Sequence, residues 1–200
     1  MIRVFPQGEP VSFDARVRQK GLAHMRAKGI DLDQPLPSGT KLPPYWRGDC
    51  LRDLYRLHGG ICAYLGVFFE EVTGAGSVDH SIAKSKWPRD AYEWDNYRLA
   101  CRAMNTKKRD FSDVLDPFCV ENGWFQLNLS IGSVHPDPAL PLADRDRVME
   151  TIKRLDLNDP AINRMRAKHY GEYARGGIDA IHLKETSPFV WHEAVRQGLL

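Results

Sequence analysis

The first sixty residues alternate between two helix-forming stretches and a segment rich in helix breakers. Residues 12–28, SFDARVRQKGLAHMRAK, predict a helix that ends at Gly29. Residues 49–58, DCLRDLYRLH, predict a shorter helix. Residues 30–48 between them contain four prolines and two glycines, which indicates an extended connector.

From Ile61 the pattern changes to short apolar runs. The stretch ICAYLGVFF is apolar and aromatic, which is typical of a strand, and Gly74 and Gly76 mark a turn after it. The predicted elements are strands at 61–69 and 77–85, a loop at 88–95 and a helix at 96–110. Together they make a small ββα unit at about residues 61–110.

The last third of the chain predicts one more strand and several helices. Asp159 and Pro160 form a helix start, because proline suits the first helical position. The predicted elements are a strand at 123–132, a proline-rich loop at 136–141 and helices at 143–155, 160–175 and 187–198. We therefore expect a single α+β domain over residues 1–200, in which helices at both ends flank the ββα core.

Composition places the chain among ordinary globular proteins. Of its 200 residues, 42 % are hydrophobic and 27 % are charged. No apolar run approaches the roughly 18 residues of a membrane span, and the start lacks the order of a signal peptide. We expect a cytoplasmic protein with no membrane partner, in which the four cysteines form no disulfides.

Charge is concentrated locally rather than over the whole chain. The net charge of +2 does not by itself indicate nucleic acid. Between Lys84 and Arg109, however, eight basic residues face three acidic ones, a local charge of about +5 that suits a polyanion. A solvated charged face is the alternative. The candidate contacts to a nucleic-acid backbone are Lys84, Lys86, Arg89, Lys107 and Arg109.

The segment SVDHSIAKSKWPRDAYEWDNYRLACRAMNTKKRD contains the groups that phosphodiester hydrolysis requires. A neutral imidazole can take a proton from water, and a divalent cation can stabilise negative charge. His80 can be the base, while Asp79 and Asn105 offer the oxygen ligands that Mg²⁺ prefers.

Geometry restricts how these residues can meet. Neighbours on a strand point to opposite faces, so the strand must end or bulge at Asp79 and His80 if both serve one site. Asn96 and Asn105 would lie on opposite faces of one helix. We therefore expect Asn96 before the helix, where its amide fixes the loop backbone. Lys108 shares a helix face with Asn105 and would reach a phosphate.

The order Asp79-His80, Asn96, Asn105 and Lys108 on a ββα frame resembles an HNH endonuclease of the H-N-N kind. The resemblance implies a ββα-metal fold, His80 as general base, Asp79 and Asn105 as metal ligands and Asn96 as loop organiser. A longer stretch, residues 62–125, is similar to the HNH proteins of Septu and retron-associated anti-phage systems. That likeness implies phage defence with an ABC-like ATPase partner.

One feature departs from the family pattern. Many HNH proteins hold a structural zinc with two Cys-x-x-Cys knuckles. Here the matching stretches are Cys62-Ala-Tyr-Leu65 and Cys101-Arg-Ala-Met104, so each lacks its second cysteine. We expect no zinc, with Cys62 and Cys101 as buried thiols.

The expected function is DNA cleavage with one Mg²⁺ or Mn²⁺ ion and little sequence preference. Two alternatives remain open from the residues. The same chemistry serves an RNA nuclease of the tRNA-cleaving type, and a binding subunit could keep the HNH fold without cutting.

Overall fold

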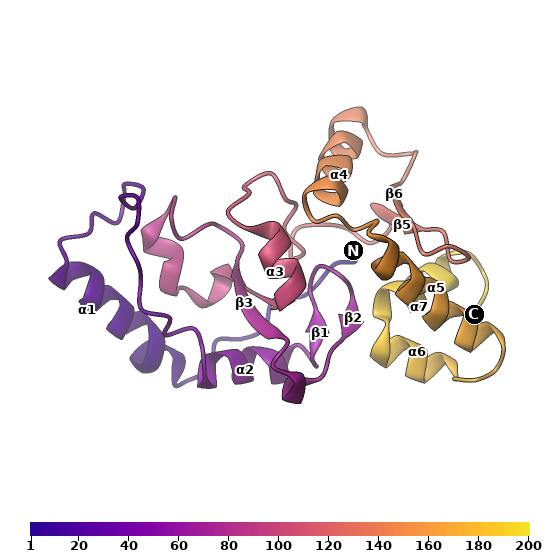
Figure 1. Ribbon diagram of the computed structural model, residues 1–200, viewed down its shortest axis with the longest axis horizontal. Helices are drawn as coiled ribbons and strands as arrows, with labels where there is room; N and C mark the ends of the chain where they lie inside the picture. The colour runs from indigo at the N-terminus through magenta and orange to yellow at the C-terminus, as the bar shows by residue number, and fades with distance from the viewer.

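The structure, a computed structural model, describes all residues from 1 to 200. Helices and three two-stranded antiparallel sheets make up the fold, which confirms the α+β class. Helix α1 lies at one end of the molecule and helices α5, α6 and α7 lie at the other, with β3 and α3 between them (Figure 1).

The two predicted N-terminal helices are present. A π-helical turn, Asp14–Arg18, continues into α1, Gln19–Ala27, and α2 spans Asp49–Leu57. Gly29, with a φ of 61°, follows α1 as expected. A Cβ on Gly21 would lie 2.1 Å from the ring of Tyr92, so only glycine lets α1 pack this closely against that ring.

The single strand predicted over 61–69 is wrong. The structure has a tight hairpin instead, with β1 at Ile61–Cys62 and β2 at Val67–Phe68. The turn between them ends at Gly66, whose φ of 59° favours glycine.

The strand pair next to α3 consists of β3, Gly76–His80, and β4, Tyr97–Cys101. They run antiparallel, with Asp79 opposite Arg98 and His80 opposite Tyr97. The prediction of a second strand over 77–85 is wrong in its length, because β3 ends at His80. The predicted helix over 96–110 is wrong in its first half, since only α3, Arg102–Lys108, is helical.

Burial on both sides explains why residues 97–101 form a strand. Tyr97 and Leu99 belong to a hydrophobic cluster with the N-terminal helices, whereas Ala100 belongs to a second cluster with the C-terminal helices. A strand sends alternate side chains to opposite faces, which suits a segment between two clusters.

The long connection between β3 and β4 is not an irregular loop. It contains two 3₁₀ turns, Pro88–Tyr92 and Trp94–Asn96. The buried side chains of Tyr92 and Trp94 anchor it in the N-terminal cluster. This connection therefore has a defined shape where it passes His80.

The C-terminal region forms a small sheet and four helices. The strand predicted over 123–132 is shorter in the structure, and the helix α6 was not predicted. The predicted helix start at Asp159 is present, because the Asp159 side chain accepts hydrogen bonds from Ala161 N and Ile162 N. The elements are β5 at Phe125–Leu127, β6 at Val134–Pro136, α4 at Leu142–Arg154, α5 at Pro160–Ala174, α6 at Ala180–Thr186 and α7 at Pro188–Arg196.

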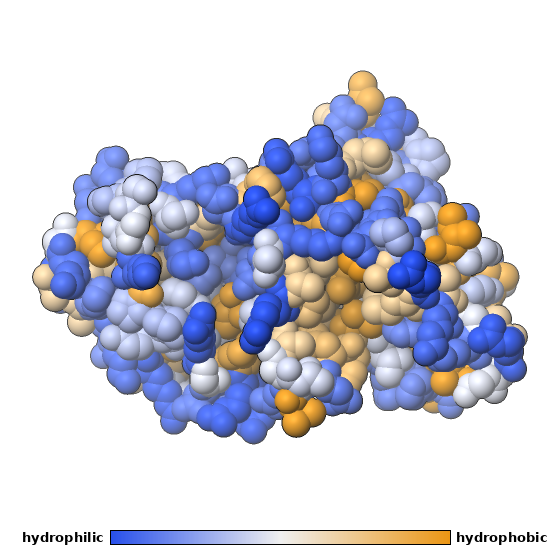
Figure 2. Space-filling view, viewed as in Figure 1, coloured by the Kyte–Doolittle hydropathy of each residue, from blue (hydrophilic) through white to orange (hydrophobic).

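The surface is mostly polar. On the face shown in Figure 2, hydrophilic residues cover most of the area, and apolar residues gather near the middle, beside the C-terminal helices. None of the helices combines the length and apolar composition that crossing a bilayer requires.

Candidate active site

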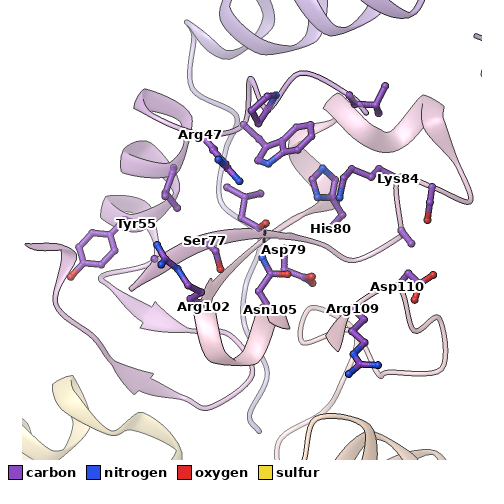
Figure 3. A pocket seen from close by; sticks show the side chains of 18 of the residues that line it. Arg47, Tyr55, Ser77, Asp79, His80, Lys84, Arg102, Asn105, Arg109 and Asp110 are labelled. Atoms are coloured by element: carbon purple, nitrogen blue, oxygen red, sulfur yellow. Dashed lines mark hydrogen bonds between the residues drawn. The ribbon is translucent and has the colours of Figure 1, made fainter. Parts of the chain in front are cut away.

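A cleft of about 1080 Å³ brings together three of the five predicted catalytic and metal-binding residues. Asp79 and His80 reach it from the end of β3, and Asn105 reaches it from α3, as Figure 3 shows. The opposite wall comes from the connector and α2, with lining residues between Thr40 and Tyr55. The site therefore extends beyond the predicted core.

Asp79 is held by two partners and keeps one oxygen free. Its side chain is 2 % exposed, and its Oδ2 accepts a hydrogen bond from the Tyr64 hydroxyl at 2.5 Å. The Lys108 ammonium lies 3.5 Å from the same oxygen. Burial outweighs these partners and raises the pKa of Asp79 to about 6. Its Oδ1 accepts no hydrogen bond.

Asn105 offers a second free oxygen beside it. The Asn105 Nδ2 donates to the backbone oxygen of Val78 at 3.2 Å, which fixes the amide so that its Oδ1 has no donor. Asp79 and Asn105 lie next to each other in Figure 3. Two oxygen ligands completed by water fit a hard divalent cation such as Mg²⁺. Nowhere in the chain do three His, Cys, Asp or Glu side chains converge on a possible metal site.

His80 is held with one ring nitrogen available. Its Nε2 lies 3.0 Å from the backbone oxygen of Ala91, which can only accept, so Nε2 carries the proton and Nδ1 keeps its lone pair. Burial, with repulsion from Lys84 and Lys108, lowers the pKa of His80 to about 3. The imidazole is therefore neutral at physiological pH and able to accept a proton.

Trp46, from the connector, holds the other side of this imidazole. The centroids of the two rings lie 4.7 Å apart at an interplanar angle of 87°. The Tyr92 hydroxyl donates to the backbone oxygen of Pro43, which fixes the connector here. The Lys84 ammonium lies 5.5 Å from the centre of the Trp46 ring. The sequence contained no signal for this contact, because it joins residues far apart in the chain.

Asn96 lies at the end of a 3₁₀ turn, just before β4, and ahead of the helix α3. Its Oδ1 accepts from the Ile82 N–H at 2.7 Å, and its Nδ2 donates to the backbone oxygens of Ile82 and Asp90 at 3.0 and 2.8 Å. These are the contacts expected of a residue that fixes the loop backbone. Asn96 therefore ties both ends of the loop after His80.

Replacing Asn96 by aspartate should destabilise the protein by about 2 kcal/mol. The carboxylate still accepts from Ile82 N–H, but the backbone oxygens of Ile82 and Asp90 lose their donor and face a negative charge. Urea unfolding of the variant measures this. The control is Asn122→Asp, because Asn122 is exposed and only accepts, from Arg3 N. Equal stability of the two variants would contradict the role of the Asn96 amide.

The predicted role of Lys108 as a phosphate contact needs correction. Its side chain is 2 % exposed, and its ammonium donates to the backbone oxygen of His80 at 2.8 Å. With Asp79 as its other partner, the ammonium lies inside the protein. Lys108 therefore ties α3 to the end of β3 instead of reaching a phosphate.

The five predicted backbone contacts divide into two groups. Lys84 and Arg109 line the cleft. Lys86, Arg89 and Lys107 lie outside it, and their contact with a nucleic-acid backbone stays a prediction. Arg89 pairs with Asp33, Lys107 pairs with Asp156 at 2.7 Å, and Lys86 donates to the hydroxyl of Ser112. Four further basic residues line the cleft that were not predicted as contacts from the sequence: Lys41, Arg47, Arg52 and Arg102.

The cysteines next to the hairpin form a contact of their own. Cys62 Sγ accepts from the backbone N–H of Cys101, and Cys62 is buried as expected, whereas Cys101 is only partly buried. A hydrogen bond from the Cys62 thiol lowers the pKa of Cys101. Leu65 and Met104 occupy the positions of the missing knuckle cysteines and are buried in the same cluster.

No protein-family model matches this chain, and a search of curated proteins likewise gives no match.

Proposed function

We propose that the chain is a metal-dependent endonuclease that hydrolyses phosphodiester bonds of DNA, with β3, β4 and α3 as a ββα-metal core of the HNH kind. One observation carries the proposal. A neutral imidazole with a free Nδ1 lines the same basic cleft as two oxygens, from Asp79 and Asn105, that lack hydrogen-bond donors.

His80 acts as the general base in this proposal. Its Nδ1 takes a proton from the attacking water, while the Nε2–H bond to Ala91 holds the tautomer. A phosphodiester in the cleft places negative charge near Lys84, and this offsets part of the repulsion that lowers the pKa of His80. The bound substrate thereby makes the imidazole a stronger base.

Asp79 and Asn105 would hold one Mg²⁺ or Mn²⁺ ion, which supplies Lewis-acid stabilisation of the charge on the leaving 3′ oxygen. Lys108 keeps the Asp79 carboxylate in place from the interior side, and Tyr64 fixes the same oxygen. Both contacts leave the second carboxylate oxygen of Asp79 for the ion.

Cleavage of supercoiled plasmid with Mg²⁺, with Mn²⁺ or with EDTA tests this function. We expect nicked and linear products with either ion and none with EDTA, and at least a tenfold slower reaction for Asn105→Ala. Asn105 is partly exposed, so this change should leave the fold intact. Metal-independent cleavage would contradict the proposal. Cleavage of RNA but not of plasmid would favour the RNA nuclease alternative.

The resemblance to anti-phage HNH proteins adds a partner to this proposal. We propose that an ABC-like ATPase gates the nuclease in phage defence. The plasmid assay, run with and without the protein encoded by the neighbouring gene, tests the gating. Rapid cleavage by the isolated chain at physiological salt would contradict it.

A further inference from the structure

The connector contributes two free cations to the cleft. Lys41 and Arg47 line it, and neither side chain forms an ion pair or a hydrogen bond within the protein. Arg52 on the same wall differs, because Asp49 neutralises it. Lys41 and Arg47 therefore carry charge that the fold itself does not use.

Further cations complete a ring around the candidate catalytic residues. Arg47, Lys84, Arg102 and Arg109 lie on different sides of Asp79 and Asn105 (Figure 3). Six basic and three acidic side chains line the cleft, so its field favours an extended polyanion over a neutral ligand. Positive charge on two facing walls is what a ligand with two phosphate backbones requires.

The aromatic residues of the cleft are already engaged. Trp46 packs edge-on against His80, and the Tyr55 hydroxyl donates to the backbone oxygen of Phe69. The most exposed tryptophan, Trp87, at 50 %, does not line the cleft. Binding of single strands relies on aromatic faces on which bases stack. The cleft instead offers charge, which suits paired strands whose bases stay stacked on each other.

We propose that Lys41 and Arg47 form a second phosphate-binding wall that holds double-stranded DNA by the strand that is not being cut. The proposal rests on the proposed nuclease function, because it assigns the cut strand to the wall with His80 and Asn105. The contacts of Trp46 with His80 and of Tyr92 with Pro43 keep the second wall at a defined position opposite the first.

Binding of a labelled duplex of about 20 base pairs, measured by fluorescence anisotropy in EDTA between about 50 and 200 mM salt, tests this wall. Each phosphate contact contributes about 0.9 to the slope of log affinity against log salt. We expect the full-length double variant Lys41→Ala with Arg47→Ala to lose about 1.8 from that slope and at least tenfold in affinity.

The matched control is the full-length Arg164→Ala variant. Arg164 is exposed on α5, forms no ion pair and does not line the cleft. A slope for the double variant equal to that of this control would overturn the proposal. Equal or tighter binding of a single strand would overturn the assignment to duplexes, and tighter binding of an RNA duplex would overturn the assignment to DNA.

The binding experiment and the cleavage assay test the second wall and the nuclease function independently. Because the affinity is measured in EDTA, a smaller salt slope in the double variant supports the wall even if the plasmid assay shows no cleavage. Cleavage of plasmid by a protein whose slope does not change in the double variant would keep the nuclease function and overturn the wall.

Discussion

Replacing His80 by asparagine should slow metal-dependent DNA cleavage by about 10²- to 10⁴-fold, the usual contribution of a general base. The asparagine amide can still donate to the backbone oxygen of Ala91 and fills most of the space beside Trp46, but it cannot take a proton from water. Single-turnover cleavage of plasmid at saturating Mg²⁺ measures the loss. Affinity for duplex DNA in EDTA should stay within about twofold, because no phosphate contact is removed.

His58→Asn is the matched control for that experiment. His58 follows α2, stacks on Phe118 and also has a pKa lowered by burial, to about 4, but it does not line the cleft. We expect its cleavage rate to stay close to wild type. Equal losses in the two variants would show that the effect comes from a buried histidine in general and not from a base at His80.

Replacing Lys108 by methionine should lower the free energy of unfolding by about 3–5 kcal/mol at pH 7. Methionine keeps the volume but leaves the buried Asp79 carboxylate without its cation and the backbone oxygen of His80 without its donor. Urea unfolding followed by circular dichroism measures the loss. The same variant should also lose cleavage activity, because Lys108 joins α3 to the end of β3.

At pH 5 the Lys108→Met variant should lose less free energy of unfolding than it does at pH 7. Asp79 has a folded pKa of about 6, above its unfolded value, so in the wild type stability falls as the pH rises toward 6 and then levels off. Without Lys108 the pKa of Asp79 in the folded state rises further, so the stability of the variant keeps falling to a higher pH. At pH 5 the Asp79 carboxyl is mostly protonated in both proteins, and an uncharged carboxyl gains little from the Lys108 ammonium.

Lys107→Met, one position earlier, serves as the control for the ion pair. Lys107 pairs with Asp156 and Asp159, and both carboxylates are solvent-accessible. A pair of this kind contributes less than about 1 kcal/mol. A cost for Lys108→Met no larger than that of Lys107→Met would contradict a stabilising buried pair at Asp79.

Local sequence was sufficient for part of the fold and of the candidate site. The helices α2, α4 and α5 lie within one or two residues of their predicted ranges, because their signals are breakers and caps such as the Asp159-Pro160 start. The requirement that a strand end at Asp79 and His80 also follows from local geometry, and β3 ends there. The expectation that Asn96 lies ahead of the helix also follows from local geometry, whereas the strand β4 between Asn96 and α3 was not predicted.

The tertiary structure decided the rest, because the deciding contacts join segments far apart in the chain. Residues 97–101 become a strand since two separate clusters bury their two faces. Which lysines and arginines face the cleft depends on partners such as Asp156 for Lys107 and Asp33 for Arg89. The sequence by itself determined which reactive groups are present, whereas the packing of the connector against His80 determined how they are arranged and what surrounds them.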